Sequence, residues 1–452
     1  MTPIPKEPPK YNDALHRILS TPARFQAVFP HMRSPTVEGR YIHWNKLRHL
    51  TPPGGITAEE WWVAVKWARD LTMKRVPING GKPISFSNPD PLQEMLCDFD
   101  RNTSGRVPVS DQIVNPHTRD RYIISTLIEE SITSSQLEGA STERKVASDM
   151  LRSGRKPRDK DEQMIFNNYL AMKYIRRKAK EQLTADTIVV LHRMVTDNTL
   201  DEVDAGRFRT DEDRVRVEDP GTNEVLYIPP SAEGIAQRME VLCEFANGKH
   251  PGGLFIHPVI RAILLHFWLA YEHPFVDGNG RTARALFYWS MINSGYWLCE
   301  YISISRIVHQ APARYRNAFL YTETDDNDAT YFVLYHLEAV LKAIDALHGY
   351  LRKKMEEMSL TQSLLKKSLL FNHRQLAILS HAIRNPAETY TIQSHANSHL
   401  VVYETARSDL MALEEMGLLM SSKVGNKYLF TAPGDLEMRL RNLTVHRGGS
   451  TR

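Results

Sequence analysis

The sequence His273-Pro-Phe-Val-Asp-Gly-Asn-Gly-Arg-Thr-Ala-Arg284 contains an imidazole, a carboxylate, two glycines and two arginines within twelve residues. Apolar segments with helical periodicity lie on both sides of it, at residues 259–271 and 285–297. The stretch is therefore predicted to be a loop that leads into the N-terminus of a helix.

The residue types in this stretch suit the binding of nucleotide phosphates. A glycine-rich loop lets backbone N–H groups converge on an anion, and the dipole of the following helix adds to the attraction. Arg281 and Arg284 share one helix face and could hold consecutive phosphates. Asp277 is suited to Mg²⁺, and His273 can act as a general base near neutral pH. A helix–loop–helix turn with solvated charges would explain single residues here, but not all of them together.

The string matches in full the motif of the Fic family, His-x-Phe-x-Asp/Glu-Gly-Asn-Gly-Arg-x-x-Arg, and the resemblance covers roughly residues 120–345. It implies a mainly α fold, with a helical Fic core. Most Fic enzymes transfer AMP from ATP to a hydroxyl group of a target protein. The resemblance therefore implies a protein adenylyltransferase that modifies a Ser, Thr or Tyr side chain.

The resemblance also implies a role for each motif residue. His273 would take the proton from the target hydroxyl, and Asp277 would hold Mg²⁺ on the phosphates of ATP. The nucleotide would be bound by Gly278, Asn279, Gly280, Arg281 and Arg284. Tyr315 lies where Fic proteins commonly place an aromatic group near the adenine, although core packing explains it equally well.

A second motif precedes the first, at Ser134-Ser-Gln-Leu-Glu138-Gly139. Taken alone, it is a serine-rich helix end with Gly139 as the C-cap. It also fits Ser/Thr-x-x-x-Glu-Gly/Asn, the inhibitory motif of the Fic family. That resemblance implies an inhibitory helix at about 120–140, in which Ser134 supports Glu138 and Glu138 pairs with Arg284. The carboxylate would occupy the guanidinium that the γ-phosphate of ATP needs.

Residues 214–229 change from helical to alternating periodicity, with a turn at Asp219-Pro-Gly-Thr-Asn223. This pattern predicts a β-hairpin. It could be a simple surface hairpin. In a Fic protein it resembles the flap that binds the target as an added strand, through Val225, Leu226 and Tyr227.

We divide the chain into an N-terminal accessory region at 1–115, predicted to be mostly helical, the Fic domain at 116–350 and a helical linker at 351–371. Residues 1–40 are rich in proline and are expected to lie loosely on the surface. Thr57-Ala-Glu-Glu60 has the spacing of a capping box and should begin a helix. Residues 141–160 are expected to be a solvated connector.

Three helices and a hairpin at 372–435 resemble a winged helix-turn-helix, followed by a tail at 436–452. Its recognition helix would be Val402–Leu413, which contains a single arginine. Acidic side chains dilute its charge, so a protein partner is favoured over DNA. The sequence leaves the formation of a homodimer open.

The overall composition is that of a globular protein of 452 residues, with 42% hydrophobic and 24% charged residues and a net charge of +4. The three cysteines form no CxxC pair and are expected to be reduced. The N-terminus is polar, and charged residues interrupt the most apolar stretch, Leu254–Phe275. These features predict a cytoplasmic protein without a membrane span.

Three alternative functions are also compatible with the sequence. A Fic enzyme could remove AMP, using Glu138 to orient water, or transfer another phosphate-containing group. A DNA-binding regulator could use the nucleotide site only to sense ATP, and it would bind DNA in a salt-sensitive manner through residues 372–431.

Overall fold

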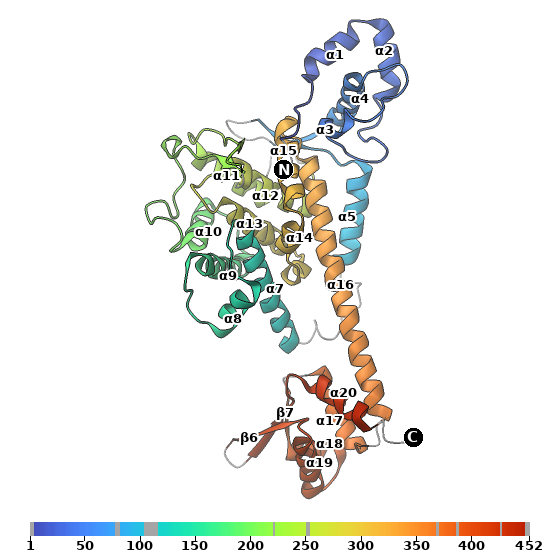
Figure 1. The fold of residues 1–452 in the computed structure, drawn as a ribbon, viewed down its shortest axis with the longest axis vertical. Helices are drawn as coiled ribbons and strands as arrows, with labels where there is room; N and C mark the ends of the chain where they lie inside the picture. The colour runs from blue at the N-terminus through green and yellow to red at the C-terminus, as the bar shows by residue number, and fades with distance from the viewer. Residues whose placement is uncertain are drawn as a thin grey trace. The chain divides into compact units, whose positions relative to one another are not determined.

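The computed structural model describes residues 4–76, 82–103, 116–219, 222–249, 254–367, 370–385, 388–424 and 427–447. The chain forms two compact units, one of residues 1–104 and 126–344, the other of residues 105–125 and 345–452. The fold is mainly α, and the described residues add three small antiparallel sheets (Figure 1). The prediction of a mainly α protein is thus confirmed. Within the described residues, no helix combines the length and the apolar character needed to cross a membrane.

The N-terminal part of the first unit is more ordered than predicted. Helices α1 (Tyr11–Leu19) and α2 (Pro22–Val28) lie within the stretch that was expected to be loose. Ala14, Ile18 and Val28 are buried in one apolar cluster with residues of α4 (Ala58–Asp70). The prediction for residues 1–40 was wrong because Pro22 stands at the first position of α2, where proline starts a helix instead of breaking it.

The helix α4 begins with the predicted capping box between Thr57 and Glu60. The other elements of this region are α3 (Trp44–Leu47), the paired strands β1 (Lys74–Val76) and β2 (Ile84–Phe86), and α5 (Asp90–Thr103). The buried ammonium of Lys66 on α4 lies 2.7 Å from the carboxylate of Asp325, just past the end of α15 (Pro312–Thr324). The Arg69 guanidinium donates to the Tyr331 hydroxyl, on the first turn of α16 (Thr330–Lys367), at 2.6 Å. These contacts fix the N-terminal region to the central helices of the same unit.

The centre of the first unit is a helical core around α12 (Pro258–Glu272) and α13 (Asn279–Asn293), which are buried along most of their length. Helix α13 packs against α9 (Lys160–Lys178), α10 (Ala185–Thr196) and α12, while α11 (Ile235–Ala246) packs against α12. The remaining helices are α7 (Pro116–Gln136), α8 (Arg144–Ser153), α14 (Ile304–Gln310) and α16 (Thr330–Lys367).

Helix α8 corrects the prediction of a solvated connector at 141–160. Its basic residues are exposed, which explains the polar composition, but Ala147 and Met150 are buried. These two side chains pack with Ile128 and Ile132 of α7. Two apolar residues three positions apart are enough to hold a short amphipathic helix on the core.

The predicted hairpin is present. Strand β3 (Val217–Glu218) pairs antiparallel with β4 (Val225–Tyr227), and Val217 lies opposite Tyr227. Pro220 and Gly221, at the expected turn, lie outside the described residues.

The second unit contains α17 (His373–Arg384), α18 (Ile392–His399), α19 (Tyr403–Glu415) and the hairpin of β6 (Met420–Val424) and β7 (Lys427–Thr431). A strand that the sequence pattern did not reveal, β5 (Thr389–Thr391), pairs with β7 and gives the sheet order β5-β7-β6. Residues 436–447, expected as a tail, form the helix α20 (Leu436–Arg447). Leu436 and Leu440 are buried in the core of this unit, so the helix is part of it.

Candidate functional site

The glycine-rich motif forms a closed loop between two buried helices. Helix α12 ends at Glu272, and His273 adopts left-handed backbone angles with φ 47°. The Asn279 side chain bridges the loop, accepting from Phe275 N at 3.0 Å and donating to Phe275 O at 2.8 Å. The Phe275 ring is fully buried. The loop is therefore anchored in the core by residues of the motif itself.

His192 on α10 supports this loop, and sequence reasoning gave it no role. Its ring stacks on Phe275, with ring centres 3.7 Å apart. Its Nε2 lies 2.8 Å from Asp277 O, and Gly206 N donates to its Nδ1 at 3.1 Å. Because the carbonyl can only accept, Nε2 carries the proton. Burial lowers the pKa of His192 to about 4, so the ring is neutral near pH 7.

Arg209 holds the start of the loop from the other side. Its backbone N donates to Pro274 O at 2.9 Å, and its Nε donates to His273 O at 2.8 Å. A second guanidinium nitrogen donates to Pro230 O at 2.5 Å, beyond the hairpin. Arg209 thus links the motif to the segment that follows β4. The Gly206-Arg-Phe-Arg-Thr210 stretch was visible in the sequence, but nothing local indicated this long-range contact.

The imidazole of His273 is oriented by the preceding helix. Its Nδ1 lies 3.2 Å from Ala270 O, so Nδ1 donates and Nε2 is the nitrogen that can accept a proton. Burial lowers the pKa of His273 below its ordinary value. A neutral imidazole with a proton-free Nε2 is the form that a general base requires.

The structure brings Ser134, Glu138 and Arg284 together, although they are far apart in the chain. The Arg284 guanidinium is buried and lies 2.7 Å from Glu138 Oε1. Its Nε donates to Ser134 Oγ at 2.8 Å, and another nitrogen donates to Ser134 O at 2.9 Å. A Cβ atom at Gly280 would collide with the Glu138 carboxylate, so that carboxylate lies directly on the start of α13. Glu138 and a phosphate cannot occupy this place together.

Arg281 and Asp277 also meet. The Arg281 side chain is buried, donates to Val195 O at 2.6 Å and lies 3.6 Å from Asp277 Oδ2. The Asp277 carboxylate is about half exposed, and its Oδ1 accepts from Gly278 N at 2.6 Å. Gly278 has φ 80°, and a Cβ there would lie 2.8 Å from Thr196 Cγ2. Glycine is required at this position both by the backbone angle and by the close approach of α10.

Tyr315 lies in an aromatic cluster, and its hydroxyl is 2.9 Å from His266 Nε2. Its ring meets Phe319 edge to face, with centres 5.1 Å apart. Burial raises the pKa of Tyr315 to about 12. Tyr315 is also partly exposed and interacts with the Arg284 guanidinium. Core packing and a place near the nucleotide therefore both stay predictions for this residue.

Some side chains of the hairpin anchor it to the core, and others are exposed to solvent. The Tyr227 hydroxyl donates to Tyr271 O at 3.1 Å, which ties β4 to α12. Leu226 is half-buried, while Val225 and the following Ile228 are exposed. On the adjoining loop, Asp219 pairs with Arg316 of α15. The hairpin is therefore held at its base and presents apolar side chains to solvent.

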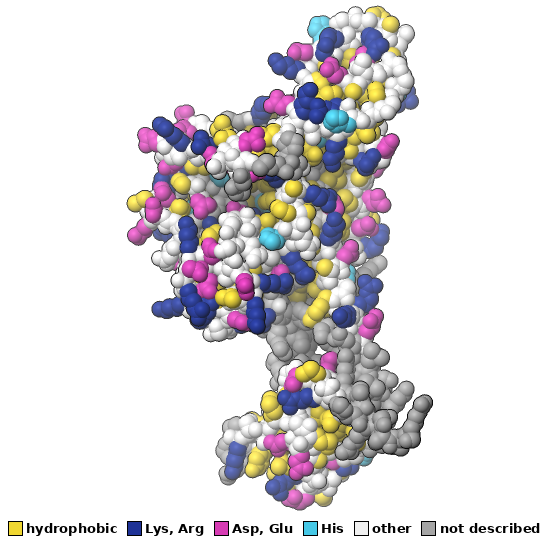
Figure 2. Space-filling view, viewed as in Figure 1, with side chains coloured by type: hydrophobic (Ala, Val, Ile, Leu, Met, Phe, Trp, Pro, Cys, Tyr) yellow, Lys and Arg dark blue, Asp and Glu magenta, His cyan; other side chains and the backbone are white. Residues whose placement is uncertain are grey.

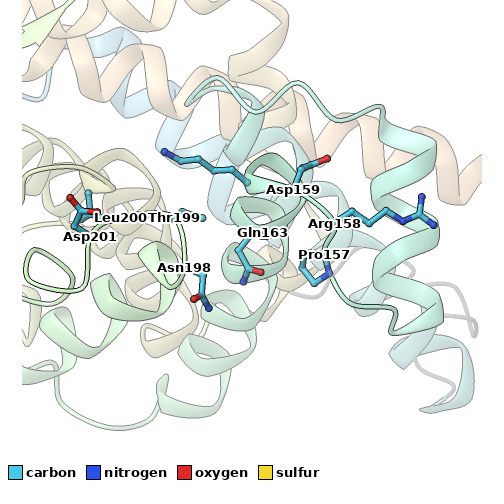
Figure 3. A pocket seen from close by; sticks show the side chains of 9 residues that line it. Pro157, Arg158, Asp159, Gln163, Asn198, Thr199, Leu200 and Asp201 are labelled. Carbon is cyan, nitrogen blue, oxygen red and sulfur yellow. The ribbon is translucent and has the colours of Figure 1, made fainter.

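A separate open hollow of about 600 Å³ lies between the start of α9 and the loop after α10 (Figure 3). No motif residue lines it. Asp159, one of its lining residues, caps α9 by accepting from Glu162 N at 2.8 Å. Its lining is polar and carries both signs of charge: Pro157, Arg158, Asp159, Lys160, Gln163, Asn198, Thr199, Leu200 and Asp201.

Residues 182–291 match the profile of the Fic/DOC family. The chain contains a Fic domain. This segment includes α10, the hairpin, α12 and the whole of the His273–Arg284 motif. Ser134 and Glu138 lie before the matched segment.

Known proteins with this domain agree with the assignment. The chain is 33% identical over 129 residues to Protein adenylyltransferase Fic of Nematostella vectensis, covering 28% of this chain and 27% of that protein. It is 37% identical over 134 residues to the protein of that name from Drosophila virilis, covering 29% and 25%. The chain thus matches about a quarter of the length of these curated relatives.

The fold is also similar to the crystal structure of a Fic family protein from Desulfovibrio desulfuricans G20. The TM-score is 0.50 at 16% sequence identity, and the match covers 76% of this chain and 96% of that chain. At this identity the similarity describes the fold and not the activity.

Proposed function

We propose that this protein is an adenylyltransferase that transfers AMP from ATP to a hydroxyl side chain of a target protein. The observation that carries the proposal is the motif loop, where the neutral His273 imidazole stands at the start of a phosphate-binding turn. The same chemistry is named in the relatives of Nematostella and Drosophila. His273 Nε2 takes the proton of the target hydroxyl, the oxygen attacks the α-phosphate, and pyrophosphate leaves.

The start of α13 would bind the nucleotide. The backbone N–H groups of Asn279 and Gly280 lie in the first turn of α13, where no helical carbonyl precedes them, and they stabilise charge on the transferring phosphoryl group. The Gly278 N–H donates to Asp277 Oδ1, and Gly278 contributes the left-handed turn that brings this backbone to the nucleotide. Arg284 binds the γ-phosphate of ATP when Glu138 is not paired with its guanidinium. Arg281 adds positive charge beneath the loop, and one of its guanidinium nitrogens keeps its hydrogen bond to Val195 O.

Asp277 is the residue that would hold Mg²⁺. The described part of the chain has no cluster of three His, Cys, Asp or Glu side chains placed for a metal. A half-exposed carboxylate beside a phosphate site fits Mg²⁺, which commonly takes one or two carboxylates and completes its shell with substrate phosphates and water. The ion would neutralise charge on the α- and β-phosphates of ATP.

Glu138 would keep the enzyme inhibited by occupying Arg284. The pairing supports this role because Arg284 makes its side-chain hydrogen bonds to Glu138 and Ser134, so a γ-phosphate would have to compete with both. Negative charge at Glu138 would also repel the phosphate. ATP then binds poorly or with its α-phosphate misplaced.

The proposal is tested by comparing ATP labelled at the α-phosphate with ATP labelled at the γ-phosphate. Both are incubated with the Glu138→Gly variant and a cell lysate. Adenylyl transfer places label on protein only from the α-position. Label from the γ-position would identify a kinase-like reaction. No label from either position would contradict the proposal and leave AMP removal or nucleotide sensing as the function.

The pH dependence of transfer follows from the lowered pKa of His273. A general base acts in its neutral form, and burial keeps the ring neutral below the ordinary pKa of 6.5. The initial rate of the Glu138→Gly variant should be constant near pH 7 and fall only as the pH drops below 6.5. Rates at saturating ATP, measured from about pH 5 to pH 8, check this. A midpoint above 6.5 would contradict the assignment of His273 as the base.

The hairpin is proposed as the docking site of the target segment. An extended segment added beside it is bound by main-chain hydrogen bonds and contacts the exposed Val225. Val225→Asp should raise the KM for the target by about tenfold, because it places a charge in this contact. Its affinity for ATP should stay unchanged. Glu224→Gln, an exposed neighbour, is the matched control, and an equal loss in both variants would argue against docking at β4.

The second unit is proposed to be a winged helix-turn-helix that binds protein. Leu400 and Val402, before α19, are 95% and 71% exposed, and Tyr403 is about half exposed. Apolar side chains beside Glu404 suit a protein surface, including a second copy of this chain, better than DNA. Over the visible face of the molecule, basic and acidic side chains are intermixed (Figure 2).

We propose a cytoplasmic location, consistent with three free cysteines.

A further inference from the structure

A buried carboxylate, Glu130, lies two helical turns before Glu138 on the inhibitory helix. Its side chain accepts from the Tyr288 hydroxyl at 2.8 Å and from Ser303 Oγ at 2.8 Å. It also accepts from Ser305 N at 3.1 Å and from the Ser305 hydroxyl. Glu130 is 2% exposed and Tyr288 is 3% exposed. A carboxylate so deeply buried is stable only while these donors remain in place.

These contacts hold α7 in an antiparallel seam along α13, through Tyr288 and Arg284, and against the start of α14, through Ser303 and Ser305. Glu130 accepts from Tyr288, Ser134 accepts from Arg284, and Glu138 pairs with Arg284 and lies against Gly280, so the residues along α7 face those of α13 in the reverse order. Glu130 and Ser134 share one face of α7, and Glu138 lies in the turn that directly follows Gln136. Sliding α7 along α13 would therefore break the Glu130 contacts and move Glu138 off Arg284 at the same time.

The seam is asymmetric. The Glu130 end is buried and carries four donors, whereas Glu138 follows the end of α7, and its side chain is 29% exposed. Helix α7 is thus held at Glu130, and the contact between Glu138 and Arg284 is made just after the helix has ended.

We propose that Glu130 is a positioning residue of the inhibition: it fixes the register of α7 on α13 and thereby keeps Glu138 on Arg284. This inference rests on the proposed function, in which Glu138 limits ATP binding. Glu130 touches neither nucleotide nor target. Its effect passes through Glu138 alone.

The test is a double-mutant cycle in the full chain. Glu130→Gln keeps the shape but removes the negative charge and leaves one acceptor oxygen instead of two, so the Ser305 hydroxyl loses its acceptor and the other three bonds weaken. ATP affinity is measured by calorimetry for the wild type, Glu130→Gln, Glu138→Gly and the double variant. Glu130→Gln should tighten ATP binding by about tenfold in the wild type and leave it unchanged in the Glu138→Gly background.

Controls separate positioning from general damage. Glu129→Gln, the neighbouring residue, pairs with the exposed side chain of Arg144 and should leave ATP binding unchanged. Tyr288→Phe removes one donor from the other side of the seam and should act like Glu130→Gln, which covers the case in which Glu130→Gln does not fold. Thermal unfolding of each variant reports its folding.

Two results would overturn the inference. If Glu138→Gly tightens ATP binding while Glu130→Gln and Tyr288→Phe do not, Glu130 has no part in the inhibition and the proposed function stands. If Glu130→Gln weakens binding equally in both backgrounds, its role is structural. A Glu138→Gly variant with unchanged ATP affinity would instead refute the inhibition itself.

Discussion

Glu138→Gly is expected to raise self-modification and ATP affinity by roughly 10- to 100-fold. The Glu138–Arg284 pair is a charge-assisted hydrogen bond at 2.7 Å on a buried guanidinium. Bonds of this kind contribute about 1.5–3 kcal/mol, which corresponds to that range of affinity. Removing the carboxylate frees Arg284 for a γ-phosphate and removes a repelling charge.

Two further variants divide this effect into its parts. Glu138→Gln keeps the size of the side chain but removes the charge, so it should give an intermediate gain. Ser134→Ala removes the acceptor for Arg284 Nε and leaves Glu138 in place, so its gain should be smaller. The three variants are compared by calorimetry with ATP and by the rate of label incorporation. Equal ATP affinity in the wild type and Glu138→Gly would contradict inhibition by occupation of Arg284.

His273→Ala is expected to reduce transfer by about 10² to 10⁴-fold while leaving ATP affinity unchanged. General-base catalysis contributes that range, and the ring contacts the backbone of α12 and no phosphate-binding residue. The comparison is made in the Glu138→Gly background, where activity is highest.

The backbone of His273 is left-handed, so a second variant is needed to separate chemistry from loop strain. Asparagine tolerates these angles better than alanine, and His273→Asn should be as inactive as His273→Ala. His309→Ala, an exposed histidine on α14, is the control and should keep full activity. Persistent transfer by His273→Asn would exclude His273 as the base.

Spacing and residue type predicted the loop and the helix start that follows it because the motif is local. Phe275, Asn279 and Gly278 act within a few residues of one another, and their contacts follow from one loop and one helix start. The contact between Glu138 and Arg284 spans 146 positions, and only the resemblance to a known inhibitory motif indicated it.

The supporting residues could not be predicted in this way. His192, Arg209 and Glu130 reach their partners across the fold, and nothing in their own helix or loop distinguishes them from ordinary polar residues. Segments with few apolar residues were also misjudged. Helices α8 and α20 each pack on the core through two buried side chains. The many charged residues around these side chains made both segments look like solvent-exposed chain in the sequence.

The central claim, adenylyl transfer restrained by Glu138, is tested most directly by intact-mass spectrometry after incubation with unlabelled ATP and Mg²⁺. The wild type, Glu138→Gly and the Glu138→Gly/His273→Ala double variant are each incubated with and without ATP. The mass of one or more added AMP groups is expected on Glu138→Gly, little or none on the wild type, and none on the double variant. A mass increase of phosphate alone, or equal AMP addition to all three proteins, would contradict the claim.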